Sequence, residues 1–225
     1  MVPGLVSDED LFREQRDALE ADVNVIVSDV SRGASLGDMA RDALAVAPER
    51  FAVAGLSMGG YVVWEILRQA RERVIAVALL DTSARPETPE QTARRRALMA
   101  LADGGDFAVV LDQLWPFEVA PSRLADAELR ARSDAMFRRS GPEVFVRQQE
   151  AIMARADSRP DLARIDVPAL VLCGRDDAIT PLDGSEEMAA GIAGAELVVL
   201  DDCGHLSTWE RPAEVTTALR HWLAR

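Results

Sequence analysis

The first 80 residues alternate between short apolar runs and longer stretches in which apolar residues recur every three or four positions. Short β-branched runs predict strands buried on both faces, and the longer stretches predict amphipathic helices that begin at polar capping residues. Strands are predicted at residues 23–27, 51–55 and 74–80, and helices at residues 7–19, 35–47 and 58–69. This alternation predicts an α/β fold with a mostly parallel sheet and helices on both faces.

The pattern changes between residues 83 and 160. Apolar runs of strand type are absent there, and four helix-like stretches are separated by Pro and Gly, at residues 88–103, 107–114, 124–139 and 142–156. Alternation then returns, with strands predicted at residues 169–172 and 197–200 and helices at residues 181–192 and 212–223. We therefore expect a core built from residues 1–82 and 161–225, with residues 83–160 as a helical insertion.

Composition narrows the class of protein. Hydrophobic residues make up 48% of the 225 residues, enough for a packed core, and the net charge of −13 disfavours nucleic acid and anionic membranes as partners. All 25 basic residues are Arg, which excludes Schiff-base and Walker-type lysine chemistry. With two cysteines, no Cys/His cluster and no secretion signal, we expect a cytoplasmic protein that needs neither a metal nor a cofactor.

Residues 55–59, Gly-Leu-Ser-Met-Gly, match the G-x-S-x-G nucleophile elbow. This motif needs a strand, a tight turn and a helix, and the predicted strand 51–55 and helix 58–69 supply them. The turn exposes the serine hydroxyl, and the helix N-terminus directs N–H groups at a developing oxyanion. Ser57 is therefore the candidate nucleophile. The alternative is a glycine-rich turn in which Ser57 has no role.

A serine nucleophile needs a general base, and the chain has only two histidines. His205 follows a predicted strand, where the active-site edge of a parallel sheet lies. His221 falls inside the last predicted helix, where packing or solvent exposure explains it. His205 is therefore the candidate base, with a purely structural histidine as the alternative.

The base in turn needs an orienting acid. The strand at residues 169–172 is followed by Asp176 and Asp177, and the strand at residues 74–80 is followed by Asp81. We favour Asp177, with Asp176 second and Asp81 third.

The chain order Ser57, Asp177, His205, together with the Gly-Arg-Asp-Asp loop at 174–177 and the Cys-Gly-His loop at 203–205, resembles the α/β-hydrolase superfamily. The resemblance covers nearly the whole chain, in the branch of enol-lactone hydrolases, meta-cleavage C–C hydrolases and small carboxylesterases. It implies that residues 83–160 form a cap, that Asp177 is the acid, and that the backbone N–H groups of Leu5 and Met58 form the oxyanion hole. A serine at the elbow also argues against dehalogenase and epoxide hydrolase activity.

One part of the family pattern is missing. The family places a central strand before the Leu5 loop, between the strands predicted here at 23–27 and 51–55, and two further strands upstream. Only Met1 and Val2 are left to form the central strand. We expect an N-terminally shortened chain, whose sheet closes by moving strands or by borrowing one from a partner, as a homodimer would allow.

These features predict a serine hydrolase that cleaves a small-molecule carboxylic ester or lactone through an acyl-enzyme. C–C bond hydrolysis or perhydrolase chemistry on the same residues, and a non-catalytic ligand-binding relative, are the alternatives. Trp115, Phe117 and Phe145 either line the substrate pocket or fasten the cap to the core. The run Arg94-Arg95-Arg96 either meets an anionic substrate or forms a solvated helix face, and we favour the solvated face.

Overall fold

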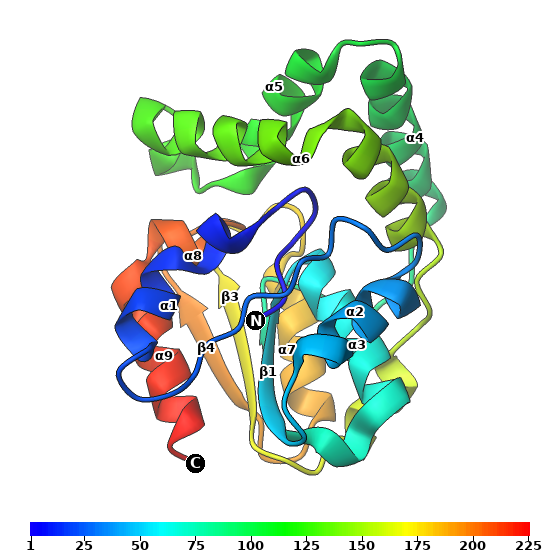
Figure 1. Ribbon diagram of the computed structural model, residues 1–225. Helices are drawn as coiled ribbons and strands as arrows, with labels where there is room; N and C mark the ends of the chain where they lie inside the picture. The colour runs from blue at the N-terminus through cyan, green and yellow to red at the C-terminus, as the bar shows by residue number, and fades with distance from the viewer.

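A computed structural model describes all 225 residues. Its sheet has four parallel strands that are adjacent in chain order (Figure 1): β1 (Phe51–Leu56), β2 (Val74–Leu80), β3 (Ala169–Gly174) and β4 (Glu196–Leu200). Alternate residues of β1 face opposite sides, so that Val53 packs into one core cluster and Ala54 into the other. The predicted α/β fold with a parallel sheet is confirmed.

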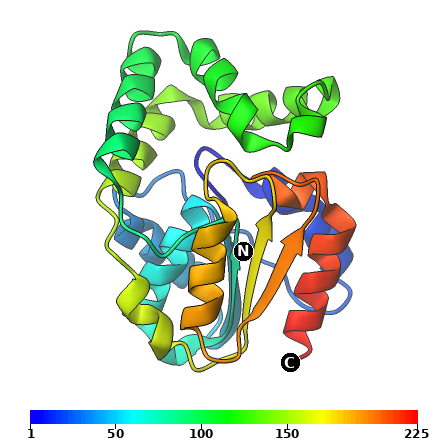
Figure 2. The ribbon, with the colours of Figure 1, turned by 180° about the vertical axis from the view of Figure 1, so that it is seen from behind.

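Helices cover both faces of this sheet (Figures 1 and 2). One face carries α2 (Leu36–Val46), α3 (Met58–Ala70) and α7 (Leu182–Gly191), and the other carries α1 (Arg13–Leu19) and α9 (Pro212–Leu223). The predicted cap at the start of α2 is present, because the Ser35 hydroxyl accepts a hydrogen bond from the Asp38 N–H. The side chain of Asp8, rather than that of Ser7, caps the first helical turn, by accepting a hydrogen bond from the Asp10 N–H.

Residues 83–160 contain no strand and include three long helices above the carboxyl ends of the strands (Figures 1 and 2). We call these helices the α4–α6 layer: α4 (Pro89–Asp103), α5 (Phe107–Glu118) and α6 (Ala127–Met153). The two helices predicted at 124–139 and 142–156 are continuous in α6 and separated only by a kink at Gly141, whose φ of 81° suits glycine. The remaining elements are short: η1 (Glu9–Phe12), η2 (Arg71–Arg73), η3 (Pro121–Arg123), η4 (Arg159–Arg164) and α8 (Ser207–Glu210).

The strand predicted at residues 23–27 does not form. These residues lie beside the N-terminus of the chain. There Val2 forms an isolated parallel β-bridge with Gly55 of β1. The Met1 α-amino group donates to the Ile26 carbonyl at 2.6 Å, and the Ser28 N–H donates to the Met1 carbonyl at 2.9 Å. A β-ladder needs a longer series of paired residues than these two bonds provide. Met1 and Val2 thus lie where the sequence placed the remnant of the central strand.

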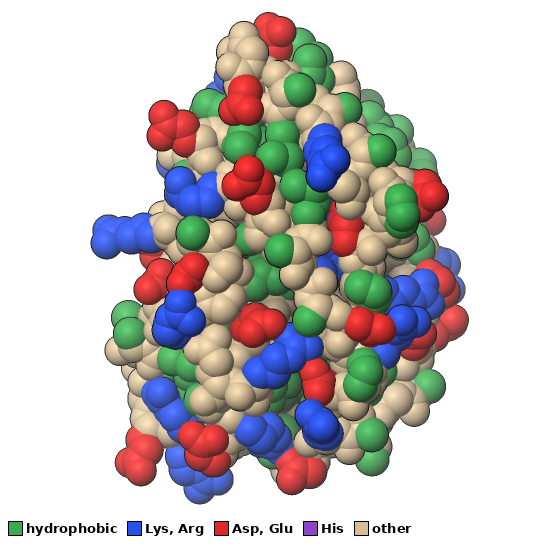
Figure 3. Space-filling view, turned by 90° about the vertical axis from the view of Figure 1, so that its right-hand side faces the viewer, with side chains coloured by type: hydrophobic (Ala, Val, Ile, Leu, Met, Phe, Trp, Pro, Cys, Tyr) green, Lys and Arg blue, Asp and Glu red, His purple; other side chains and the backbone are tan.

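The surface carries both signs of charge. Acidic and basic side chains are interleaved on the face shown in Figure 3, and many are paired, as Arg68 is with Asp161 at 2.8 Å. Such exposed pairs contribute little to stability individually. None of the helices is both long and apolar enough to cross a lipid bilayer.

Candidate active site

Ser57 lies at the turn between β1 and α3, with φ 55° and ψ −119°, a conformation that non-glycine residues seldom adopt. Its carbonyl accepts hydrogen bonds from the Thr82 hydroxyl at 2.7 Å and from the Gly60 N–H at 2.9 Å. A side chain at Gly55 would collide with the Gly59 backbone, and one at Gly59 would collide with the Val2 backbone. The two motif glycines therefore let strand and helix approach closely enough to hold this strained turn.

His205 and Asp177 are in direct contact. The Nδ1 atom of His205 lies 2.8 Å from Oδ2 of Asp177, and the two side chains are 6% and 0% exposed. Asp177 also accepts hydrogen bonds from the N–H groups of Ile179 and Thr180 and from the Thr180 hydroxyl. Three donors besides the imidazole thus fix the carboxylate and, through it, the ring of His205.

Burial lowers the pKa of His205, but the charge of Asp177 and its hydrogen bond raise it by more, so the pKa lies above its ordinary value. The pair is therefore built to stabilise an imidazolium ion, which is the state that a general base reaches after taking a proton.

The other candidates for acid and base lie elsewhere. Asp176 is exposed, and His221 is exposed on α9 beside Glu196. Asp81 is fully buried, but it accepts hydrogen bonds from the Gly174 N–H and the Ser207 hydroxyl rather than from the imidazole. Of the three aspartates considered, only Asp177 contacts His205.

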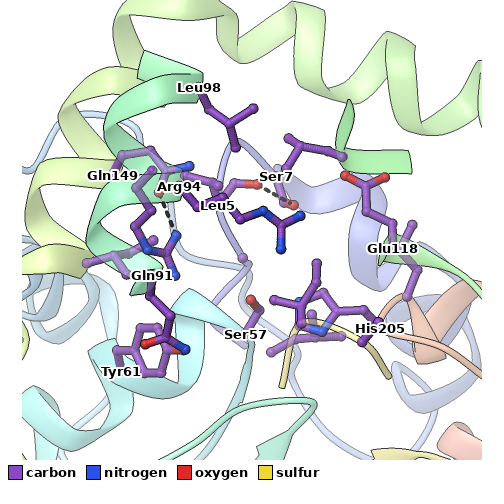
Figure 4. Close-up of a pocket in the computed structure, with 18 of the residues that line it drawn as sticks. Leu5, Ser7, Ser57, Tyr61, Gln91, Arg94, Leu98, Glu118, Gln149 and His205 are labelled. Carbon is purple, nitrogen blue, oxygen red and sulfur yellow. Dashed lines mark hydrogen bonds between the residues drawn. The ribbon is translucent and has the colours of Figure 1, made fainter. Parts of the chain in front are cut away.

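Ser57 and His205 both line a cavity of about 340 Å³ between the sheet edge and the α4–α6 layer (Figure 4). No hydrogen bond joins the Ser57 hydroxyl to the imidazole in this structure. Tyr61, Gln91 and Gln149 lie on one side of the cavity, and His205 lies on the other (Figure 4). The structure therefore brings the predicted nucleophile and base to one cavity, with Asp177 behind the base.

Two backbone N–H groups are available beside Ser57. Met58 is the first residue of α3, so its N–H has no acceptor within the helix. Leu5 also lines the cavity, in a loop that crosses the sheet edge next to the elbow. The next residue, Val6, is held at φ 46°, and its N–H donates to the Gln148 side chain at 2.7 Å. A side chain of the α4–α6 layer thus fixes the backbone of the Leu5 loop.

The three aromatic residues predicted for the pocket do not line this cavity. Phe145 is fully buried against Phe107 inside the α4–α6 layer, and the Trp115 indole donates to the Leu124 carbonyl. The Phe117 ring packs against the guanidinium of Arg94 at 3.9 Å. Sequence alone does not say which side of a helix faces the cavity, and the aromatic residues that line it are Tyr61 and Phe137.

Two of the three consecutive arginines reach the cavity, contrary to the favoured interpretation of a solvated face. Arg95 is held by Glu87 at 2.9 Å and by Gln149 at 2.6 Å. Arg94 lines the cavity and extends between the residues on its two sides (Figure 4), has no ion-pair partner and rests on Phe117. Arg96 is exposed and does not line the cavity.

Glu118, the last residue of α5, was not identified from the sequence. It is 5% exposed and lines the cavity on the same side as His205 (Figure 4). Burial raises the pKa of Glu118 to about 7, although a hydrogen bond from Ser133 partly opposes this. The available sequence signal is a single acid inside residues 114–120, a run that is otherwise without charge.

Two carboxylates and a thiol near the site lie close enough together to be considered as metal ligands. Atoms of Asp81, Cys173 and Asp177 lie within 4.8 Å of one another. The oxygens of both aspartates already accept hydrogen bonds from protein groups, and burial raises the pKa of the Cys173 thiol, which keeps it protonated. These groups are therefore better suited to orienting His205 than to binding a cation.

A sequence profile described as the alpha/beta hydrolase family matches residues 1–218, and the chain belongs to this family. The structure is similar to a thermophilic esterase from Thermogutta terrifontis, solved with malate bound, at 30% identity and a TM-score of 0.88 over 99% of this chain and 88% of that chain. It is also similar to the enol-lactonase from Burkholderia xenovorans LB400, at 27% identity and a TM-score of 0.89 over 100% of this chain and 90% of that chain.

Among curated proteins, the chain is 38% identical over 106 residues to a 2-hydroxy-6-oxononadienedioate/2-hydroxy-6-oxononatrienedioate hydrolase of Escherichia coli (strain K12 / DH10B). The matched stretch is 46% of this chain and 37% of that protein, so it spans well under half of the relative. The predicted resemblance to the enol-lactonase and esterase branch is confirmed.

Proposed function

We propose that the protein is a serine hydrolase that cleaves a small-molecule carboxylic ester or lactone. The observation that carries the proposal is the buried contact of 2.8 Å between His205 Nδ1 and Asp177 Oδ2, on a cavity that also exposes the strained Ser57. In this mechanism His205 takes the proton of the Ser57 hydroxyl, and the serine oxygen attacks the substrate carbonyl.

The oxyanion that forms is stabilised by the N–H groups of Leu5 and Met58. The protonated His205, oriented by Asp177, gives its proton to the leaving alcohol. Water then attacks the acyl-enzyme with His205 again as base, and Ser57 is regenerated. The α4–α6 layer acts as a cap that limits access of water and substrate to the cavity.

Hydrolysis of a C–C bond on the same residues is the second candidate. It is favoured by the similarity to the E. coli hydrolase, because the name of that relative specifies 2-hydroxy-6-oxo dienedioate and trienedioate substrates rather than esters. In the proposed ester hydrolysis the acyl group of the ester becomes covalently attached to Ser57, and this adduct distinguishes it from C–C bond hydrolysis. Mass spectrometry of enzyme quenched during turnover of an aryl ester detects that adduct.

A fluorophosphonate probe tests the hydrolase proposal against a non-catalytic binding protein. Labelling is expected in the unmodified protein, and its loss is expected in Ser57→Ala and in His205→Ala. Asp176→Asn, a change in an exposed carboxylate, is the matched control and keeps full labelling. A folded protein that the probe leaves unmodified contradicts the proposal.

A further inference from the structure

Glu118 presents an unpartnered carboxylate oxygen to the cavity. Its Oε2 accepts a hydrogen bond from the Ser133 hydroxyl at 3.0 Å, and Ser133 is itself 2% exposed. Its Oε1 accepts no hydrogen bond from the protein and is not enclosed by other atoms, so it opens onto the cavity that Glu118 lines. No arginine forms an ion pair with this carboxylate. The nearby Arg130 is paired instead with Asp112 and Asp134, both at 2.7 Å. A carboxylate oxygen that opens onto a cavity and has no donor from the protein is free to accept a hydrogen bond from a ligand.

The Glu118 backbone ties this carboxyl group to the loop that carries the base. The Leu206 N–H donates to the Glu118 carbonyl at 2.9 Å. The buried carboxylate of Glu210 makes a second connection to the same loop. It accepts hydrogen bonds from the Ala120 N–H, two residues after Glu118, at 2.8 Å and from the Gly204 N–H at 2.9 Å. Glu118 therefore keeps a fixed position relative to His205 although the two residues belong to different layers.

We propose that Glu118 is a substrate-binding residue that accepts a hydrogen bond from a hydroxyl group on the alcohol portion of the ester or lactone. The inference rests on the proposed hydrolase function. His205 delivers its proton to the leaving alcohol, so the alcohol portion lies on the His205 side of Ser57, which is the side that Glu118 occupies (Figure 4).

The charges around the cavity favour a neutral donor over an ionic one. Arg94 and Arg95 both line the cavity and oppose an ammonium group. An anionic group next to an ionised Glu118 would be repelled. Because burial brings the pKa of Glu118 to about 7, both its protonated and its ionised forms are populated at neutral pH, and both can accept a hydrogen bond from a hydroxyl group.

A matched pair of esters tests this proposal. In 2-hydroxyethyl butyrate a hydroxyl replaces the terminal methyl of propyl butyrate, so the two substrates have nearly the same size and the same acyl group. The measured quantity is the ratio of kcat/KM for the hydroxyl ester to kcat/KM for the propyl ester, from titration of released butyrate. Hydrogen bonds to a charged group affect such ratios by about tenfold to a hundredfold.

Glu118→Leu is expected to lower this ratio at least tenfold while propyl butyrate is still cleaved. Glu118→Gln keeps a side-chain carbonyl of the same size and is expected to retain part of the preference, which guards against a folding defect in the leucine variant. Glu128→Leu is the matched control, because Glu128 is exposed on α6 and does not line the cavity.

Two results would overturn the inference alone. One is a ratio that stays unchanged in Glu118→Leu, and the other is an equal loss of activity on both esters in both Glu118 variants, which indicates a purely structural role. In either case the unmodified protein still cleaves propyl butyrate, so the hydrolase proposal stands. Failure to cleave either ester, together with no labelling of Ser57 by the fluorophosphonate probe, overturns the hydrolase proposal and this inference with it.

Discussion

The side-chain carbonyl of Gln148 accepts a hydrogen bond from the backbone N–H of Val6 at 2.7 Å, although the two residues are 142 positions apart. The amide group of Gln148 donates in turn to the Val30 carbonyl at 3.0 Å, and the side chain is 1% exposed. Val6 has φ 46°, an unfavourable conformation for a β-branched residue that costs about 1–3 kcal/mol. Through Gln148, the α4–α6 layer therefore helps to offset the backbone strain in the loop that contains Leu5.

Replacing Gln148 with leucine is expected to slow turnover more than it weakens substrate binding. Without the side-chain amide the Val6 N–H and the Val30 carbonyl lose their partners, and the Leu5 loop relaxes away from the oxyanion. We expect kcat to fall about tenfold to a hundredfold with a smaller change in KM, because an oxyanion donor acts mainly in the transition state. Steady-state kinetics measures both constants. Gln113→Leu, a change at an exposed position of α5, is the control, and an equal effect there contradicts the explanation.

The pH dependence of activity is expected to follow His205. The base must be neutral, so kcat/KM rises with pH through the pKa of the imidazole, and this pKa lies above the ordinary value of 6.5 because of Asp177. Asp177→Asn removes the negative charge that raises the pKa of His205, while burial still lowers this pKa. The midpoint of the pH profile is therefore expected to move to lower pH, and kcat is expected to fall by about 10⁴. A profile from pH 5 to 9 measures both effects.

Glu118 also titrates in this pH range, and Glu118→Gln separates its contribution from that of His205. If the rise in kcat/KM with pH disappears in Glu118→Gln, that rise reflects ionisation of the Glu118 carboxyl group, and the assignment to His205 is wrong.

Glu118 is expected to lower the stability of the protein at alkaline pH. Its pKa is about 7 in the folded protein against an ordinary value of 4.5, so the folded state binds the proton more tightly. The stabilisation that comes from this tighter proton binding is fully present below pH 4.5 and is lost as the pH rises through 7. The loss is about 3 kcal/mol for a fully buried group. Urea unfolding at pH 5 and pH 8 should show that Glu118→Gln stabilises the protein more at pH 8. An equal effect at the two pH values contradicts this account.

Arg94 is expected to favour substrates with an anionic acyl portion. Its guanidinium lines the cavity without an ion-pair partner and is held against Phe117. Because the group is exposed, the gain is small, and Arg94→Gln should lower kcat/KM for monopropyl succinate relative to propyl pentanoate by about two- to fivefold. Added salt should reduce the same preference. Arg96→Gln removes a neighbouring charge that does not line the cavity, and a comparable loss in that variant would show that only the general field of the helix matters.

Local patterns were sufficient for the sheet and the elbow. The strands β1 to β4 were predictable because buried β-branched runs and glycine turns depend on near neighbours in sequence, and residues 55–59 carry the geometry of their own turn. The strand predicted at residues 23–27 failed for a different reason. Its residues have strand composition, but in the structure only two backbone hydrogen bonds join this segment to Met1, which is too few for a β-ladder.

Side-chain direction in the α4–α6 layer was not predictable. Phe145 and Trp115 have the residue types of a substrate pocket, yet their contacts are with other residues of the layer. Glu118 and Gln148 have residue types typical of a solvated helix, yet they are buried because helices far apart in sequence pack around them. Pairings such as that of Glu118 with Ser133 follow from tertiary packing and leave no local pattern.

The absence of lysine gives the N-terminal hydrogen bonds an experimental use. In a protein produced as these 225 residues, starting at Met1, the α-amino group of Met1 is the sole primary amine, and burial lowers its pKa to about 5 while it is bonded to the Ile26 carbonyl. An amine-selective acylating reagent can modify the folded protein only when that bond opens. The rate of a single covalent modification therefore measures how often the first two residues detach from β1.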